Sequence, residues 1–473
     1  MTALVASGCG SNQDQASGPD ASRDVAAEGS MREAEAPDAL AAPVDASADA
    51  ADASDAGSPP QGVVSSSPLT AFEAETQLAV APDGTIAIVW IGNPSATSSA
   101  GQLVGYTFWT PGAAAWSTVQ TLTHGPTDYA TDPTVVADPA GNFYVAWFGL
   151  GSDQVPHVWL AKAPSGTTTF GAPTLVSDPA VDARMTIDDK PWLAATNRGT
   201  LLVSYNPVAL DANGNPIEAS IVVARSFDGA GTWTRTSVPG TASASVAYLC
   251  PPTAGTRTYL VDAEGGGGAD GGGADAGPGD GGDAGAVPAY VGVHVSDDGQ
   301  TWSGSNVTLT TLDDVGIPSC AAEGDDLWVD YGLSKTPFAG SSNPDYVMRV
   351  AHFGGGGTTL LGDVAASADE TAPLFLDEQI VRRPSGQLDR VFFAGQSDGD
   401  PAGTFRRTAS TDLGATWPAS TTVHAPELFT MVRHRGPWLG DYVGLRAVGA
   451  ALYVAYPRNS ETGSSHVAFQ ILP

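Results

Sequence analysis

The chain has 473 residues, with 52 acidic side chains against only 20 Lys and Arg, which gives a formal net charge of −32 at pH 7. A field of that sign repels phosphate backbones, so nucleic acid is not expected as a partner. Hydrophobic residues make up 42% of the chain, enough for one large folded domain, and no long apolar segment suited to crossing a bilayer is evident.

The first nine residues resemble the end of a bacterial lipoprotein signal. Residues 1–8 (MTALVASG) are apolar, end in small side chains and directly precede Cys9. In such signals the chain is cut before the cysteine and a lipid is attached to it. The resemblance therefore implies lipidation at Cys9 and an exported bacterial protein anchored at the outer membrane or cell surface. Ala6 departs from the pattern, and the missing basic start is expected to lie upstream of Met1. A chance cysteine is the alternative.

Residues 10–60 form an acidic tail. They are mostly Ala, Asp, Ser and Pro, and they carry eleven acidic side chains against Arg23 and Arg32. A segment of this composition buries too little apolar surface to offset its chain entropy. We therefore expect a disordered tether between Cys9 and a folded domain at 61–473.

Short runs of β-branched and aromatic residues recur through the rest of the chain, each preceded by a Gly-containing turn. This is the pattern of a hairpin strand. Successive turn glycines lie 57, 58, 56, 69, 62 and 63 residues apart. Regular spacing without helical periodicity predicts an all-β fold, a single β-propeller whose blades have about four strands each. The seven runs are 84–90, 141–147, 199–205, 255–261, 324–330, 386–392 and 449–456.

Three of these units also carry one eight-residue turn, with the template Ser-x-Asp-x-Gly-x-Thr-Trp. The copies are SFDGAGTW (226–233), VSDDGQTW (295–302) and STDLGATW (410–417). In such a turn a short carboxylate bonds to nearby amides, Gly takes the strained backbone angle and Trp packs the hairpin on the sheet. The residues given these structural roles are Ser226, Asp228, Trp233, Asp297, Gly299, Trp302, Ser410, Asp412, Gly414 and Trp417.

The turn is similar to the Asp-box, also called the BNR repeat, and through it the chain resembles the sialidase superfamily of β-propellers. The resemblance implies that each box lies on the hairpin between the third and fourth strands of a blade, away from the active site. The box residues are therefore expected to hold turns and not to act on a substrate. That family usually has six blades, so six stays open beside the seven that the repeats favour.

The ends of the propeller are expected to meet in its last blade. After Tyr456, only residues 464–472 remain to form one more strand. A blade that ended one strand short would expose an edge, which folded proteins avoid. We expect Gln61 to Ser66 to supply the missing outer strand.

Residues 264–288 are nearly all Gly, Ala and Asp, and they interrupt the unit with the longest spacing. This composition predicts a disordered surface loop. A calcium-binding Gly-Asp repeat is the alternative, but it would need a regularly placed hydrophobic residue, and the segment has none.

Cys250 and Cys320 precede the strands of two consecutive units by similar distances. Equivalent positions in neighbouring blades lie side by side on the inner strands. In an oxidising compartment this arrangement predicts a disulfide, and two buried free thiols are the alternative.

Polar residues gather just before the expected innermost strands. In a propeller the loops that enter these strands converge on one mouth of the central channel, which is the default place for a ligand. Two such segments, 188–194 (DDKPWLA) and 435–445 (RGPWLGDYVGL), share Pro-Trp-Leu and resemble segments of bacterial sialidase-like proteins. Packing of Trp192 and Trp438 between blades, with the charges on a solvated rim, is the alternative. The candidate binding residues are Arg184, Lys190, Arg433, Arg435 and Asp441.

The family resemblance implies one function, the release of terminal sialic acids by an exo-α-sialidase. In that chemistry three arginines hold the substrate carboxylate, an Asp is the acid/base and a Tyr is the nucleophile. Carried over to this chain, the nucleophile is Tyr442 and the acid/base is Asp188 or Asp189. The family's Arg-Ile-Pro motif is missing, however, and the first unit carries Glu73 and Glu75, which would repel a carboxylate sugar.

We therefore favour a second hypothesis, with the sialidase as the alternative. It describes a monomeric surface or periplasmic lipoprotein, a propeller tethered to the membrane by its lipid, that binds glycan or protein ligands without catalysis. Neither hypothesis calls for a cofactor or a metal ion.

Overall fold

The structure is a computed structural model, and it describes the chain in segments. Cys9, nearly all of the tail 10–60 and nearly all of the loop 264–288 lie outside the described residues. So do Arg184, Arg433 and Arg435. The described residues are 57–65, 72–93, 101–122, 129–150, 155–177, 187–210, 216–241, 244–251, 257–264, 290–307, 314–315, 317–334, 347–366, 374–395, 400–429, 440–459 and 464–473.

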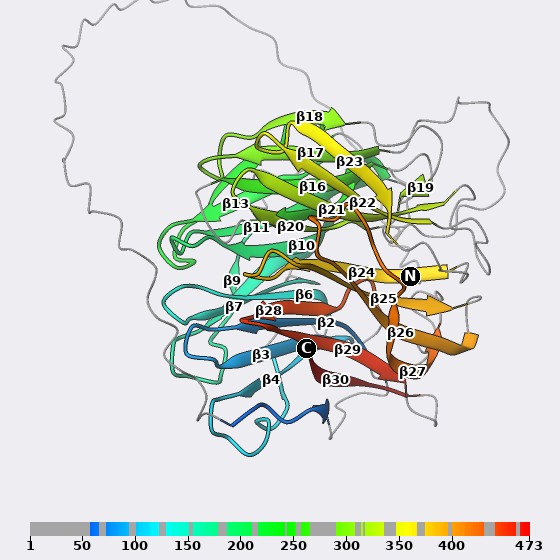
Figure 1. Ribbon diagram of the computed structural model, residues 1–473. Coiled ribbons are helices and arrows are strands. Elements are labelled where there is room, and N and C mark those ends of the chain that lie inside the picture. Colours follow the sequence, from blue (N-terminus) through cyan, green and yellow to red (C-terminus); the bar gives the residue numbers. More distant parts are fainter. Residues whose placement is uncertain are drawn as a thin grey trace, which may run out of the picture. The chain divides into compact units, whose positions relative to one another are not determined.

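Seven antiparallel sheets follow one another in chain order and form the blades of a β-propeller (Figure 1). Each blade has four strands, and two blades carry one additional short strand. One strand of every blade lines a central channel, and these are the innermost strands; in the fifth blade it is β20 (Ser319–Glu323), and in each other blade it is the first strand. The all-β propeller predicted from the sequence is confirmed, with seven blades instead of six. No helix in the described part of the chain is long and apolar enough to cross a membrane.

The first three blades contain β2 (Phe72–Val80), β3 (Ile86–Asn93), β4 (Leu103–Trp109) and β5 (Gln120–Thr121); β6 (Ala130–Ala137), β7 (Phe143–Leu150), β8 (Pro156–Ala163) and β9 (Thr174–Leu175); and β10 (Ile187–Ala195), β11 (Leu201–Leu210), β12 (Pro216–Ala219), β13 (Val222–Ser226) and β14 (Thr234–Ser237). Blades four and five contain β15 (Ala244–Cys250), β16 (Thr258–Glu264), β17 (Tyr290–Ser296) and β18 (Ser303–Val307); and β19 (Asp314–Val315), β20 (Ser319–Glu323), β21 (Asp326–Ser334), β22 (Val347–Gly354) and β23 (Thr359–Ala365). The last two contain β24 (Leu374–Arg382), β25 (Leu388–Gly395), β26 (Asp400–Ser410) and β27 (Thr421–Phe429); and β28 (Gly444–Val448), β29 (Ala451–Asn459), β30 (Ser465–Leu472) and β1 (Gly62–Val63).

The N-terminal strand β1 closes the seventh blade. Gly62 lies opposite Phe469 and Val63 opposite Ala468 of β30. The red strands of this blade consequently lie beside the blue strands of the first blade (Figure 1). The predicted closure by the segment that begins at Gln61 is confirmed, and it covers an edge that would otherwise be open to pairing.

Glu73, in the first blade, stabilises the closed seventh blade through hydrogen bonds. Its carboxylate accepts hydrogen bonds from the Ser65 hydroxyl and from the amide of Val467, 3.1 Å away, while its own amide donates to Ser465 at 2.7 Å. The side chain is fully buried, and burial raises the pKa of Glu73 to about 7, although its hydrogen bonds act in the opposite direction.

The core lies between neighbouring sheets, where large side chains such as Trp90, Trp147 and Trp328 are fully buried. One buried ion pair crosses from the fifth to the sixth blade. The guanidinium of Arg390 binds both carboxylate oxygens of Asp330, at 2.6 and 2.7 Å. Such a bidentate pair fixes the relative position of two sheets.

Two of the repeated turns have the same hydrogen bonds. In the turn from β13 to β14, the Ser226 hydroxyl donates to Asp228 at 2.8 Å, and Asp228 accepts from the amide and hydroxyl of Thr232 at 2.9 and 2.7 Å. The turn from β26 to β27 repeats this set with Ser410, Asp412 and Thr416. These bonds lower the pKa of Asp228 and Asp412 to about 2. Both turns join the third and fourth strands of a blade, as expected.

The third copy, between β17 and β18, differs from the prediction by one residue. Asp298, and not Asp297, accepts the hydrogen bonds of the turn, from the amides of Gln300 and Thr301 at 2.7 and 2.6 Å and from the hydroxyl of Ser296 at 3.0 Å. Asp297 instead forms an ion pair with Arg257, at 3.0 Å.

The length of the turn explains the shift. The other two copies place two residues with positive φ in succession, Gly229 and Ala230 in one and Leu413 and Gly414 in the other. The third copy has only Gly299, at φ +70°, so it is one residue shorter and its Ser-x-Asp pair begins one position later.

Cys250 at the end of β15 and Cys320 in β20 form a disulfide, with their Cα atoms 6.0 Å apart. The bond joins the innermost strands of blades four and five, where the sequence placed it. The separation lies within the usual range for a disulfide.

Candidate functional site

The innermost strands of blades one, two and three share a backbone irregularity at the same place. The pairing of each with its neighbour shifts by a bulge, at Ala74/Gln77, Thr131/Thr134 and Asp189/Trp192. Inside these bulges Glu75, Asp132 and Lys190 have φ angles of +50°, +51° and +49°. That conformation crowds the β-carbon and costs about 1 kcal/mol for each residue. Strain repeated on three charged residues at one level of the channel marks a candidate site.

The bulges bring these charges together with Asp441, which precedes the innermost strand of blade seven. The ammonium of Lys190 lies 3.0 Å from Asp132 and is also hydrogen-bonded to Asp441. Oxygen atoms of Glu75, Asp132 and Asp441 all lie within 4.8 Å of one another, and the three residues are buried. We call Glu75, Asp132, Asp189, Lys190 and Asp441 the acidic cluster.

The protonation of the cluster follows from its burial and charge. Burial by itself would lower the pKa of Lys190, but the carboxylates around it, Asp132 foremost, raise that pKa well above its usual value. Burial and the charge of Asp132 raise the pKa of Asp189 to about 6, although the ammonium and amide of Lys190 lower it. The cluster therefore contains a firmly charged lysine and one carboxyl that titrates near neutral pH.

Three carboxylate oxygens at this spacing are a donor set that suits a hard cation. Here the ammonium of Lys190 already contacts two of them, so the chain supplies a positive charge of its own. The spacing of these oxygens alone is therefore no reason to place a metal ion here.

An aromatic layer lies next to the cluster. Tyr442 donates a hydrogen bond to the carbonyl of Pro133 at 3.2 Å and meets Trp192 edge to face, with 5.6 Å between ring centroids. Trp192 in turn packs against Tyr248, with 3.7 Å between ring centroids. Burial, together with the charges of Glu75 and Asp132, raises the pKa of Tyr442 well above its usual value.

The structure brings together four of the residues singled out from the sequence, namely Asp189, Lys190, Asp441 and Tyr442. Asp188 has a different neighbour: its buried carboxylate lies 3.4 Å from Nδ1 of His157 in β8. The three predicted arginines fall in segments outside the described residues.

Glu75 and Asp132 belong to the cluster; both are among the polar residues that precede the expected innermost strands, but neither was chosen as a candidate binding residue. A signal for them exists in the sequence, because AETQL, TDPTV and DKPWL occupy equivalent places in the first three units. In each, a charged residue precedes Thr or Pro at the start of the innermost strand. Aligning the units at their first strands, instead of at their turns, would have placed the three charges at one level.

Comparisons with known proteins bear on the fold alone. No family model matches the chain, and no curated protein is similar to it. Among solved structures it is similar to a Hadza microbial sialidase, with 16% identity, a TM-score of 0.46, and 85% of this chain and 66% of the other covered. It is also similar to a protein of unknown function from Dyadobacter fermentans, with 18% identity, a TM-score of 0.48, and 72% and 94% covered.

A third similar structure is the sialidase of Trypanosoma rangeli, with 12% identity, a TM-score of 0.48, and 85% of this chain and 54% of the other covered. The chain thus spans less than two thirds of the length of either sialidase. At these identities and TM-scores the likenesses carry no argument about function, which rests on the site alone.

Proposed function

We propose that this protein is an exported, lipid-anchored propeller that binds neutral glycans at the acidic mouth of its channel. The observation that carries the proposal is the charge of the acidic cluster. Its four carboxyl groups surround one ammonium, and that ammonium already pairs with Asp132 and Asp441. A ligand that enters this mouth meets an excess of negative acceptors.

Neutral sugars suit such a mouth. Ionised carboxylates are strong acceptors for hydroxyl groups, and the partly exposed ring of Trp192 next to them suits the apolar side of a sugar. A sialic acid would bring a carboxylate of its own into a negative field, which costs binding energy.

The exo-α-sialidase alternative meets two obstacles in the described part of the site. Its nucleophile would be Tyr442. The hydroxyl of Tyr442 donates a hydrogen bond to a backbone carbonyl and its pKa is raised, so the reactive phenolate is disfavoured. The cation of the cluster is Lys190, and its charge is already neutralised by Asp132 and Asp441, so it is not free to hold a substrate carboxylate. The arginine clamp carried over from the resemblance uses Arg184, Arg433 and Arg435, which lie outside the described residues.

Hydrolysis of a neutral glycoside is a second candidate, favoured by one observation. The pKa of Asp189 is raised to about 6, which suits a general acid near neutral pH, and other carboxylates lie beside it. A fluorogenic arabinoside or galactoside that the wild-type protein cleaves, and that Asp189→Asn leaves intact, would establish this activity in place of binding alone.

Export and lipidation belong to the same proposal. A disulfide between Cys250 and Cys320 is typical of proteins that fold in an oxidising compartment, which supports export. Labelling of the full chain with radioactive palmitate in a bacterial host, with Cys9→Ser as the control, tests the anchor. Label retained by Cys9→Ser would contradict it.

Binding is tested on a glycan array with the full chain. The wild-type protein and Asp325→Asn, which changes an exposed carboxylate far from the cluster in sequence, are expected to be retained on neutral glycans, and Asp132→Asn is expected to lose retention. Turnover of a fluorogenic sialoside that disappears in Tyr442→Phe would overturn the proposal in favour of the sialidase.

A further inference from the structure

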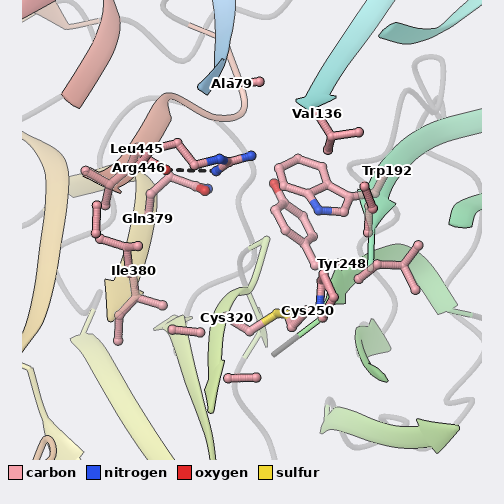
Figure 2. A pocket seen from close by; sticks show the side chains of 18 of the residues that line it. Ala79, Val136, Trp192, Tyr248, Cys250, Cys320, Gln379, Ile380, Leu445 and Arg446 are labelled. Carbon is pink, nitrogen blue, oxygen red and sulfur yellow. Dashed lines mark hydrogen bonds between the residues drawn. A yellow bond between two sulfur atoms is a disulfide. The ribbon is translucent and has the colours of Figure 1, made fainter. Parts of the chain in front are cut away.

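The channel contains a cavity that differs in character from the acidic cluster. Its volume is about 340 Å³, which lies in the range of small-molecule pockets. The innermost strands of all seven blades contribute to its wall (Figure 2). Val80, Ala137 and Ala447, near the ends of their strands, are only partly buried, so the cavity reaches solvent at that end of the channel.

A guanidinium projects into this cavity. Arg446 of β28 points toward the rings of Trp192 and Tyr248 (Figure 2). One of its nitrogens donates to the carbonyl of Leu445 at 2.8 Å, and within the described part of the chain it forms no ion pair with an Asp or Glu. The protein around it lowers its pKa to about 10, so the group is charged at neutral pH.

The buried arginines Arg383 and Arg390 are paired, whereas Arg446, which is only partly buried, has no carboxylate partner among the described residues. Arg390 binds Asp330 and Arg383 binds Asp389, in both cases at 2.6 Å. Because the cavity reaches solvent, water can solvate this guanidinium, and an anion in the cavity would replace that water with a charged partner. Arg446 therefore has unused donors in a space large enough for a ligand.

The cavity is separated from the acidic cluster by the aromatic layer. Trp192 lies against Tyr248 at 3.7 Å and against Tyr442 at 5.6 Å between centroids. Trp192 also lines both the cavity and the small space beside Asp132 and Lys190. The two sites share this wall but no charged residue, so each can be tested without the other.

We propose that the cavity binds a small organic carboxylate. The planar fork of Arg446 matches the two oxygens of a carboxylate, and the rings of Trp192 and Tyr248 take up the apolar body of the ligand. Most of the remaining lining residues are Ala, Val, Leu and Ile, but more than half of the accessible wall is polar, so the ligand can also form hydrogen bonds beside its contact with the rings.

Benzoate is the probe that tests this site, by calorimetric titration into the full chain at constant ionic strength. Wild-type protein and Arg198→Gln, which changes an exposed turn arginine, are expected to bind it with equal affinity. Arg446→Gln is expected to bind at least about tenfold more weakly, since it removes a charge-assisted pair. Asp132→Asn is expected to keep benzoate binding, because it changes the acidic cluster alone.

Equal affinity of Arg446→Gln and wild type, or no saturable binding by the wild type, would overturn the proposal. A crystal grown with 4-bromobenzoate gives an answer that does not depend on the folding of any variant. The anomalous signal of bromine is expected in the channel between Arg446 and Trp192, and a signal found only elsewhere would contradict the site.

Discussion

Lys190 in blade three is hydrogen-bonded to Asp441 at the entrance to blade seven, although 251 residues separate them in the sequence. The same ammonium contacts Asp132 of blade two. One partly buried charge thus joins three blades at the level where the chain also stores backbone strain. The acidic cluster therefore links three blades of the ring, and it is where we propose that a ligand binds.

Replacement of Lys190 by Met leaves the carboxylates of Asp132 and Asp441 buried without their counter-charge. We expect the free energy of unfolding to fall by about 3 kcal/mol or more at pH 7. Urea unfolding at this pH measures the loss. Lys162→Met is the matched control, since it removes only an ammonium above the ring of Tyr144, worth about 1 kcal/mol or less. Equal losses in the two variants would contradict the account.

The pKa of Glu73 predicts a fall in stability with rising pH. Burial raises it from 4.5 to about 7, so the folded state holds this proton more tightly than the unfolded chain does. The contribution is fully present below pH 4.5 and is lost as the pH rises through 7, and it amounts to about 3 kcal/mol. Subtracting the stability of Glu73→Gln from that of the wild type, in urea titrations from pH 4.5 to 8, isolates this group. A difference that does not change with pH would refute the assignment.

The two aspartates of the short turn give a direct comparison. Asp298→Ala removes the acceptor for the amides of Gln300 and Thr301, whereas Asp297→Ala removes only an exposed ion pair with Arg257. Because exposed ion pairs contribute little, we expect a lower melting temperature for Asp298→Ala and almost no change for Asp297→Ala. A lower melting temperature for Asp297→Ala than for Asp298→Ala would instead support the register expected from the sequence, in which Asp297 holds the turn.

The disulfide closes a loop of 70 residues between blades four and five. Restricting the unfolded chain over that length stabilises the fold by about 4 kcal/mol in the chain-entropy description. Cys250→Ser combined with Cys320→Ser should lower the unfolding free energy by a large part of this amount. Mass analysis with alkylation before and after reduction checks the bond itself, and two thiols alkylated without reduction would disprove it.

Sequence periodicity predicted the framework of this protein well, because blades repeat. The strand after each Gly turn, the hairpin position of the repeated turns and the closure by the segment at Gln61 all follow from spacing and from the need to cover an edge. The pairing of Cys250 with Cys320 follows from the same repeat. The register predicted at 295–302 was wrong because the template was aligned on Gly299 and Trp302. The aspartate that holds the turn is instead the one two residues after the serine, which is Asp298 after Ser296.

The site was harder to predict, for two physical reasons. Positive φ angles at Glu75, Asp132 and Lys190 arise from bulges, and no Gly or Asn in the sequence announces them. Arg446 alternates with apolar residues in GLRAV as any strand residue would, so its direction into the channel and its lack of a carboxylate partner appear only in three dimensions.

The central claim, that an acidic mouth selects neutral glycans, is tested most directly with one glycan measured in two forms. Calorimetric titration of the full chain compares lactose with the same disaccharide carrying a terminal sialic acid. The account predicts saturable binding of lactose that is lost in Asp132→Asn, and weaker or no binding of the sialylated form. Tighter binding of the sialylated form, or its cleavage during the titration, would contradict the claim.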